Sequence, residues 1–239
     1  MERDVIVENQ CSREKITGIF LPVIEDAIAA YQAVFGDSLL NIRLLGSVAR
    51  GEANRHSDID FIAVLSVSPS AEQMSEIERQ EKALQHRHAF IPKVDLEAVP
   101  AEGLSEFRRF VFAVDSLSLL GSDIYTLQSQ TVDRKRHADM VTPDLTQIVT
   151  SYRNAVEKAD EGDEHLLSFY SRLIGKDILK CLRRIALLRG GQYERNIGKI
   201  YQQLLHYAPE RQELLHELFD LYSHPISDKQ RLIQGLRHI

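Results

Sequence analysis

Residues 39–65, LLNIRLLGSVARGEANRHSDIDFIAVL, decide the fold of this chain. The apolar run at 39–45 predicts a strand that leads into a turn at Gly46 and Ser47. The run at 59–65 predicts a second strand, which the chain enters through two aspartates. A strand, a Gly-Ser turn, a short helix and a second strand are therefore expected in this order.

Asp58 and Asp60 stand at the entrance of the second predicted strand. Alternate side chains of a strand point to the same face, so the two carboxylates are expected to project together. Neighbouring carboxylates repel each other unless a cation lies between them. Magnesium is a hard cation that prefers oxygen ligands such as carboxylates and phosphates. This pair therefore predicts a magnesium–nucleotide site, with Mg²⁺ held by Asp58 and Asp60.

The predicted turn supplies groups that could bind the nucleotide. Backbone N–H groups at Gly46 and Ser47 can cradle a phosphate, and a helix that opens at Ser47 would add its positive end. We place the Ser47 side chain on a phosphate oxygen. Arg50 is a second candidate for phosphate contact. The alternative is that Arg50 is simply an exposed arginine of the helix. Ser57 is included in the nucleotide site, with a hydrogen bond inside the polar loop as its alternative role.

The sequence GSVARGEANRHSDIDF at residues 46–61 resembles the signature of the DNA polymerase β-type nucleotidyltransferase superfamily. It is most similar to the small bacterial members that modify aminoglycoside, lincosamide and other antibiotics. The resemblance extends over roughly residues 38–125. It implies an α+β fold, namely a small mixed-sheet core with helices, and a transferase that is ATP-binding and metal-binding.

A third carboxylate from a later strand completes the metal site in this superfamily. The apolar stretch at 90–99 predicts a further strand that carries Asp95 and Glu97 on one face. The resemblance implies that Asp95 joins the metal site and acts as general base toward the acceptor hydroxyl. Glu97 is the alternative, because a glutamate plays this part in some of the antibiotic-modifying relatives.

The resemblance implies nucleotidyl transfer from a nucleoside triphosphate, with ATP favoured, to a hydroxyl of a small molecule. An antibiotic is the expected acceptor, which would make the protein an antibiotic-resistance enzyme, and pyrophosphate is released. Nucleotidylation of a partner protein, as in antitoxin-like relatives, is one alternative. A non-catalytic nucleotide-binding sensor is another. The sequence leaves the acceptor, the nucleotide and the oligomeric state open, and a homodimer is possible.

The composition excludes several classes of protein. The chain has 239 residues, of which 44% are hydrophobic, so an ordered core is expected. Cys11 and Cys181 are the only cysteines, too few for a disulfide framework. The charged N-terminus lacks the apolar core of a signal peptide, and no apolar run approaches the roughly 20 residues that span a bilayer. We therefore expect a cytoplasmic protein without a membrane partner.

The charge is unevenly distributed along the chain. The net charge of −6 comes from 29 Lys and Arg against 35 Asp and Glu. Residues 131–239 hold 17 basic and 15 acidic residues, which leaves 12 basic and 20 acidic for residues 1–130. A nucleic-acid-binding surface would be strongly basic, so nucleic acid is an unlikely partner.

The second half of the sequence predicts helices only. We divide the chain into a nucleotidyltransferase core domain at 1–125, a polar linker at 126–143 and a C-terminal helical domain at 144–239. Helical periodicity predicts a long helix at 164–190 with a basic stripe along one side. Lys176 and Lys180 in this stripe are candidates for nucleotide binding, and a solvated cationic face is the alternative.

Overall fold

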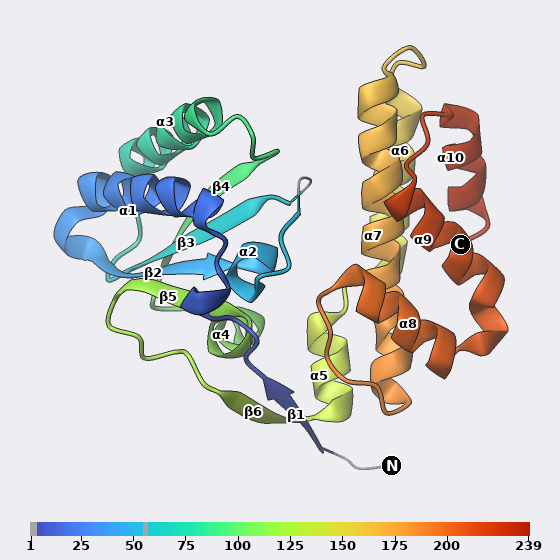
Figure 1. Ribbon diagram of the computed structural model, residues 1–239, viewed down its shortest axis with the longest axis horizontal. Helices are drawn as coiled ribbons and strands as arrows, with labels where there is room; N and C mark the ends of the chain where they lie inside the picture. Colours follow the sequence, from blue (N-terminus) through green and yellow to red (C-terminus); the bar gives the residue numbers. More distant parts are fainter. Residues whose placement is uncertain (1–3, 55–56) are drawn as a thin grey trace. The chain divides into compact units, whose positions relative to one another are not determined.

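The computed structural model describes residues 4–54 and 57–239 and divides the chain into two compact units. One unit is Ile6–Thr131, and the other is Val132–Ile239 together with the N-terminal residues up to Val5. Two short strands, β1 (Asp4–Glu8) and β6 (Ser129–Asp133), pair with each other at the boundary. Figure 1 shows the helices and strands of each unit.

The first unit is built on a sheet in the order β4-β3-β2-β5. Its central strands are β2 (Leu39–Leu45) and β3 (Ile59–Leu65), which run antiparallel to each other. The outer strand β5 (Ser116–Gly121) is antiparallel to β2, whereas β4 (Val94–Pro100) is parallel to β3. The predicted small mixed sheet is confirmed, and it places the two strands that carry the candidate carboxylates side by side.

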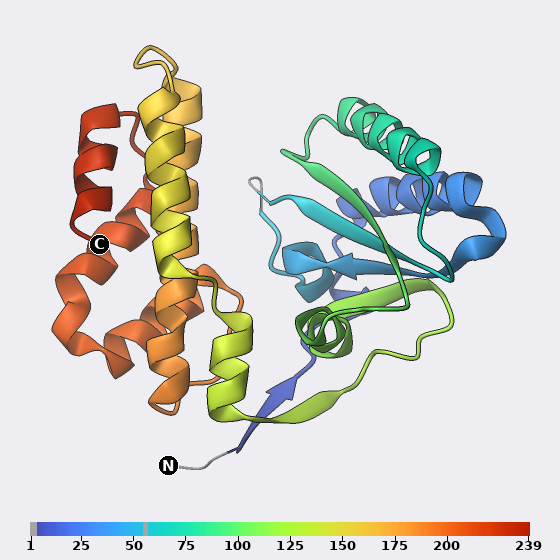
Figure 2. The ribbon, with the colours of Figure 1, turned by 180° about the vertical axis from the view of Figure 1, so that it is seen from behind.

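Helices cover both faces of this sheet. Figures 1 and 2 show α1 (Leu21–Phe35) and α3 (Ala71–Arg87) on one side and α4 (Glu106–Val114) on the other. Alternate side chains of β3 point to opposite faces of the sheet. Those of Ile59, Phe61, Ala63 and Leu65 belong to the core cluster under α1 and α3. Asp60 therefore projects from the opposite face of the strand.

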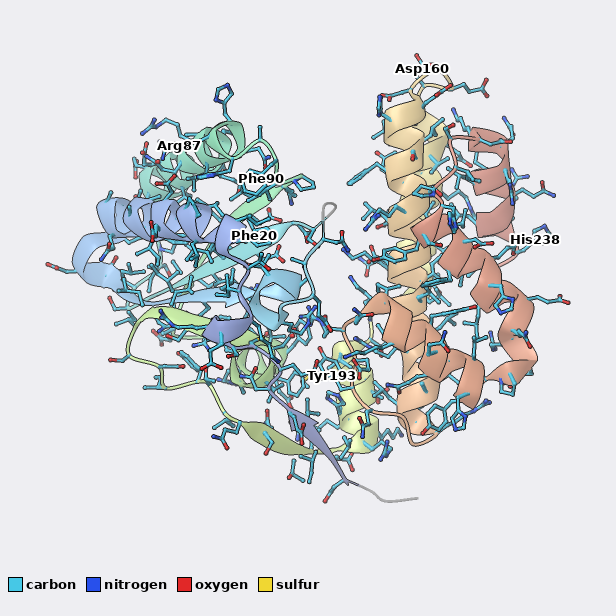
Figure 3. The ribbon with its side chains drawn as sticks, viewed as in Figure 1. Phe20, Arg87, Phe90, Asp160, Tyr193 and His238 are labelled. Atoms are coloured by element: carbon cyan, nitrogen blue, oxygen red, sulfur yellow. The ribbon has the colours of Figure 1, made fainter. Side chains whose placement is uncertain are left out.

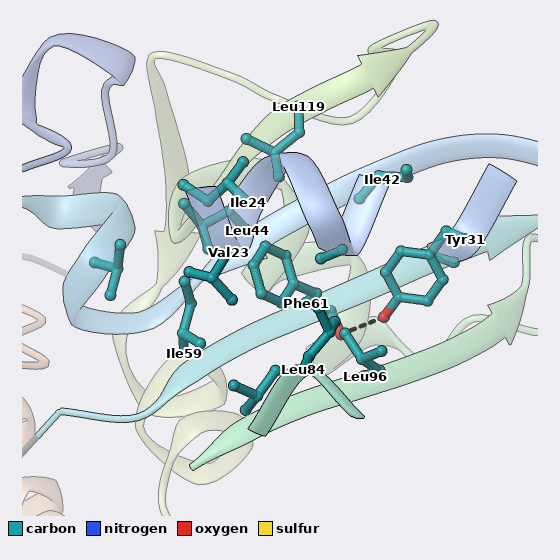
Figure 4. Close-up of a cluster of buried hydrophobic side chains, with 14 of the residues drawn as sticks. Val23, Ile24, Tyr31, Ile42, Leu44, Ile59, Phe61, Leu84, Leu96 and Leu119 are labelled. Carbon is teal, nitrogen blue, oxygen red and sulfur yellow. Dashed lines mark hydrogen bonds between the residues drawn. The ribbon is translucent and has the colours of Figure 1, made fainter. Parts of the chain in front are cut away.

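Tyr31 ties α1 to the two parallel strands. Its side chain is completely buried, and its hydroxyl lies 3.1 Å from the carbonyl oxygen of Phe61 and 3.0 Å from that of Glu97 (Figure 4). A buried hydroxyl needs such partners, because leaving it unsatisfied in an apolar core is costly. The contact links β3 to β4 next to the candidate site.

The second unit is helical. Its helices are α5 (Arg134–Val141), α6 (Leu145–Lys158), α7 (Glu164–Leu188), α8 (Ile197–Tyr207), α9 (Gln212–Ser223) and α10 (Lys229–Arg237). Most of them begin at an Asp or Asn whose side chain accepts a hydrogen bond from the backbone N–H of the third helical residue, as at Asp144 and Asp163. Apolar faces of α6 to α10 form one core cluster, so the predicted helical region is confirmed.

Two predicted boundaries differ from the structure. The stretch 126–143, expected as a linker, contains β6 and α5, whose polar compositions conceal them in the sequence. The strand expected from residue 90 begins at Val94, after a turn that contains Pro92. Proline lacks a backbone N–H and disfavours regular pairing around it. Helix α1 begins at Leu21, with Pro22 in its first turn.

One segment of the described chain, Gly18–Ser38, is long enough and apolar enough to cross a membrane, judged by length and composition alone. This segment had not been identified in the sequence analysis. It contains α1, in which Val23, Ala27 and Tyr31 have no exposed surface. These side chains pack in the core of the first unit (Figure 4), and this packing accounts for the apolar composition of the segment.

Candidate active site

Gly46 and Asp60 lie against each other where β2 ends. Leu45 and Asp60 are opposite residues in the antiparallel ladder of β2 and β3. Gly46 follows with a φ of +77°, and a Cβ atom at this position would lie only 2.8 Å from Oδ2 of Asp60. Glycine adopts this conformation without strain and leaves this space open. The glycine of the Gly-Ser pair therefore lets the Asp60 carboxylate lie against the turn.

Asp60 and Asp95 are partners across the parallel pair of strands. The register of β3 and β4 places Asp60 opposite Asp95 and Ile62 opposite Glu97. Register partners on neighbouring strands project from the same face of the sheet. Asp95 is thus the carboxylate of β4 that stands level with Asp60, whereas Glu97 is displaced by two residues along the strand.

Asp58 precedes this ladder by one residue. The backbone N–H of Ile59 donates to the carbonyl oxygen of Lys93 at 3.0 Å, so the pairing of the two strands begins immediately after Asp58. Asp58 is partly exposed, as are Asp60 and Asp95. Residues 55–56, which precede it in the sequence, lie outside the described part of the chain.

Basic partners distinguish Asp95 from Glu97. Both carboxylate oxygens of Glu97 accept hydrogen bonds of 2.7 Å from the guanidinium of Arg108 on α4. Asp95 receives one hydrogen bond of 2.6 Å from Nζ of Lys93. This hydrogen bond raises the pKa of the Lys93 ammonium, and the charges of Asp95, Glu81 and Asp60 add to the rise. The Lys93 ammonium therefore interacts electrostatically with the carboxylates of both Asp95 and Asp60.

The donor set of the site fits a hard cation. Asp58, Asp60 and Asp95 offer carboxylate oxygens, and Gly46 leaves room beside one of them. Within residues 4–54 and 57–239, no group of three or more His, Cys, Asp or Glu side chains is drawn together as a metal site. Next to Asp95, the Lys93 ammonium lies 2.6 Å from Oδ2 of the carboxylate.

Ser47 and Ser57 flank the turn differently. Ser47 is half-buried in the first turn of α2 (Gly46–Arg50), and its carbonyl oxygen accepts a 2.8 Å hydrogen bond from the N–H of Glu52. The Ser57 hydroxyl accepts a 2.9 Å hydrogen bond from the N–H of Asn54. This bond matches the alternative role expected for Ser57, while the contact of Ser47 with phosphate stays a prediction.

Arg50 is neither exposed nor directed toward solvent, contrary to one expectation. Its guanidinium donates to Oδ1 of Asp115 at 2.8 Å and to Oε2 of Glu52 at 2.9 Å. The side chains of Arg50 and Asp115 are 8% and 2% exposed. The charge that we considered for phosphate binding is therefore used in a buried ion pair that fixes α2 to the end of α4.

Lys176 and Lys180 belong to the helical unit. Nζ of Lys180 lies 3.1 Å from Oδ1 of Asp177, whose other oxygen accepts a hydrogen bond from the Tyr152 hydroxyl. Burial lowers the pKa of Lys180; Asp177 opposes this, and the charges of Lys176 and Arg195 add to it. The basic stripe thus includes a partly buried cluster, and nucleotide binding by Lys176 and Lys180 stays a prediction.

Two residues of α3 that the sequence analysis missed hold the free edge of β4. The N–H of Leu96 donates to Oε2 of Glu81 at 2.9 Å, and the N–H of Val94 donates to Oε1 of Gln85 at 2.7 Å. These two N–H groups flank Asp95 on the side of the strand that has no neighbouring strand. In the sequence, Glu81 and Gln85 are unremarkable polar residues of a charged helix.

The comparison with protein families gave a match over the region that holds the candidate site residues. A family described as "Nucleotidyltransferase domain" matches residues 35–117, which include Gly46, Asp58, Asp60 and Asp95. The comparison with curated proteins gave no match.

The comparison with solved structures gave two matches to report, and the likeness in fold rests on the first. Spectinomycin adenyltransferase AAD(9) from Enterococcus faecialis, solved with ATP and spectinomycin, has a TM-score of 0.54 at 9% identity, covering 91% of this chain and 97% of that one. The CdnE cyclic dinucleotide synthase of Elizabethkingia meningoseptica, with GTP and Apcpp, reaches a TM-score of 0.30 at 13% identity, covering 90% and 89%. Residues 35–117 match the nucleotidyltransferase domain family, and the chain resembles the DNA polymerase β-type antibiotic nucleotidyltransferases.

Proposed function

We propose that this protein is a magnesium-dependent nucleotidyltransferase. It moves a nucleoside monophosphate from a nucleoside triphosphate, with ATP favoured, to a hydroxyl of a small acceptor and releases pyrophosphate. The observation that carries the proposal is the pairing of Asp60 with Asp95 across β3 and β4, with Gly46 held against the Asp60 carboxylate. A structural ion-pair network has no need for two level carboxylates beside an open glycine turn.

The residues of the site would divide the work as follows. Asp58, Asp60 and Asp95 would hold magnesium, which supplies neutralisation of phosphate charge and lowers the pKa of a bound hydroxyl. Asp95 would accept the proton of the acceptor hydroxyl, whose oxygen attacks the α-phosphorus. The bond from the α-phosphorus to the bridging oxygen breaks in line, and pyrophosphate leaves. Positioning and charge neutralisation provide most of the acceleration, so no covalent nucleophile is required.

The ion pair between Lys93 and Asp95 would change when the site binds a metal ion. The Lys93 ammonium pairs with Asp95 at 2.6 Å, and both side chains are partly exposed. A cation bound by Asp60 and Asp95 would repel this ammonium, which sits on a flexible stem and can turn toward solvent or toward a phosphate. The exposed pair is weak, so its rupture costs little.

The acceptor in this proposal is an antibiotic of the aminoglycoside or lincosamide kind. Support comes from the sequence resemblance to small antibiotic nucleotidyltransferases and from the shared fold of spectinomycin adenyltransferase. The fold likeness justifies spectinomycin as the first acceptor to test, and the other antibiotics follow from the resemblance alone.

The proposal is tested by incubating the protein with magnesium and each α-phosphate-labelled nucleoside triphosphate. One series contains spectinomycin and an antibiotic panel, and a second contains a cell lysate. Label on an antibiotic supports the proposal and identifies the acceptor class. Label on a lysate protein would replace it with protein nucleotidylation. Binding of nucleotide without transfer in either series would replace it with a sensor.

A further inference from the structure

A cavity of about 340 Å³ lies between α7, α9 and α10 of the helical unit, and the proposed transfer reaction makes no use of it. Its deepest side chains are Ile174, Leu218, Leu232 and Leu236, each at most 2% exposed and part of the helical core. Leu221 and Ile226 extend the apolar lining toward the surface. Protein interiors leave few voids larger than a water molecule, and ligand pockets begin at roughly 300 Å³. The cavity has the size of a site for a compact small molecule.

Gly235 keeps this cavity open. It lies inside α10 and lines the cavity, and a Cβ atom added to it would meet no other atom within 4 Å. Glycine inside a helix is destabilising relative to alanine, so an interior glycine usually has a packing reason. Gly175 on α7 has one, because a Cβ there would lie 2.3 Å from the carbonyl oxygen of Leu218. No contact requires Gly235, and its effect is to leave space inside the cavity.

The mouth of the cavity carries an excess of negative charge. Glu217 and Asp220 line it from α9, and Arg231 lines it from α10, all three being exposed. Asp220 also lies 3.6 Å from the ring of His224. The carboxyl end of α9, at Ser223, adds the partial negative charge of its free carbonyl groups. The lining also holds His224 and His238. With both imidazoles neutral, two carboxylates and a helix end outweigh one guanidinium, so the mouth attracts a cation.

We infer that this cavity binds a small apolar molecule that carries one protonated amine. The hydrocarbon body lies against Leu218, Leu232 and Leu236, and the ammonium lies at the mouth toward Glu217 and Asp220. Apolar walls with a few polar groups at one end are the usual composition of a small-molecule site. Because this cavity lies within the helical unit, the inference stands independently of the proposed nucleotidyl transfer.

Three compounds with one shared body test the inference by isothermal titration calorimetry on the full chain at low salt. They are 1-adamantanamine, 1-adamantanol and 1-adamantanecarboxylate. We expect the amine to bind about two- to fivefold more tightly than the alcohol, as an exposed ion pair allows, and the carboxylate to bind most weakly. Glu217→Gln is expected to reduce the advantage of the amine while the alcohol binds as before.

Glycine variants test the location of the site. Gly235→Leu fills the cavity and is expected to weaken all three compounds at least tenfold. Gly18→Leu is the matched control, because a Cβ there also meets no atom within 4 Å but lies in the other unit. Gly235→Ala adds one methyl group and should keep binding while raising the melting temperature. Failure of all three compounds to bind the wild type, unchanged binding by folded Gly235→Leu, or a carboxylate as tight as the amine would overturn the inference.

Discussion

Asp60 on β3 stands directly opposite Asp95 on β4 in the parallel part of the sheet. The sequence separates these residues by a loop, a turn and the whole of α3. Side chains of β3 that point the other way belong to the core under α1 and α3, so the carboxylate pair occupies the face away from these helices. This pairing is what turns a Gly-Ser turn and an Asp-x-Asp motif into a candidate active site.

Asp95 and Glu97 give the first prediction. Asp95→Asn should lower the rate of nucleotidyl transfer roughly 10²- to 10⁴-fold, because it removes the proposed general base, which stands level with Asp60. Glu97→Gln should change the rate less than about twofold, since this carboxylate is engaged by Arg108 away from the pair. Single-turnover rates with labelled nucleotide measure both. A larger loss in Glu97→Gln would assign the general base to Glu97.

Gly46 gives the second prediction. Gly46→Ala should destabilise the protein by about 1–2 kcal/mol through its positive φ, and it should also displace the Asp60 carboxylate. Misplacement by about 1 Å can cost about 10²-fold in rate, so we expect a loss of that order. The measurement is the transfer rate at a temperature where circular dichroism shows the variant folded.

Gly36→Ala is the control for that experiment. Gly36 also has a positive φ, of +48°, but a Cβ there would meet no atom within 4 Å. The variant should also be destabilised by its positive φ, but it should keep the wild-type transfer rate. Equal rates in Gly46→Ala and Gly36→Ala would contradict the role given to the contact between Gly46 and Asp60.

The buried pair of Arg50 and Asp115 gives the third prediction. Arg50→Met leaves the Asp115 carboxylate, 2% exposed, without the guanidinium that neutralises it. Loss of one partner of a buried ion pair costs about 3–5 kcal/mol in the free energy of unfolding. The double variant Arg50→Met/Asp115→Leu should recover much of this loss, and urea denaturation measures all three proteins. An additive or greater loss in the double variant would speak against a coupled pair.

His137 gives a prediction of pH dependence. Burial, followed by the charges of Arg183 and Arg134, lowers the pKa of His137 to about 4 in the folded protein. An unfolded histidine titrates near 6.5, so between pH 6.5 and 4 the unfolded state binds more protons. The folded state should therefore lose stability as the pH falls through this window. Above pH 7 the histidine is neutral in both states and contributes no slope.

His137→Phe tests this dependence. The variant keeps a ring for the edge contact with Tyr193, whose ring centroid lies 5.0 Å away, but it cannot take up a proton (Figure 3 labels Tyr193). Between pH 7 and pH 4.5, the melting temperature of the variant should fall by less than that of the wild type. Parallel decreases in both proteins would assign the acid sensitivity to other groups.

Local pattern was sufficient for the central strands. Residues 39–45 and 59–65 were predicted with the bounds that the structure has, because each is a short apolar run that ends at polar or glycine residues. The polar compositions of β6 and α5 carry no such signal, and the stretch read as a linker. Short polar elements depend on contacts with other parts of the chain, which periodicity does not register.

Partners that lie far apart in the sequence could not be predicted. The sequence showed that Asp95 and Glu97 share a face of their strand, but only the register with β3 separates them. Arg50 was expected as an exposed residue or a phosphate ligand, because its partner Asp115 lies beyond two further strands and two helices. Lys93 next to Asp95 has no motif of its own.

The catalytic role of the Asp60–Asp95 pair is tested most directly by comparing Asp60→Asn with the wild type. Transfer of labelled nucleoside monophosphate to the best acceptor is measured in a single turnover with saturating magnesium, and melting temperatures are recorded in parallel. Asp60→Asn keeps the shape of the side chain beside Gly46 but removes its charge. We predict that the wild type labels the acceptor and that Asp60→Asn retains its fold and loses at least about 10²-fold in rate, as expected when metal-held charge neutralisation fails. Transfer by Asp60→Asn at the wild-type rate would contradict the central claim that the Asp60–Asp95 pair forms the catalytic site.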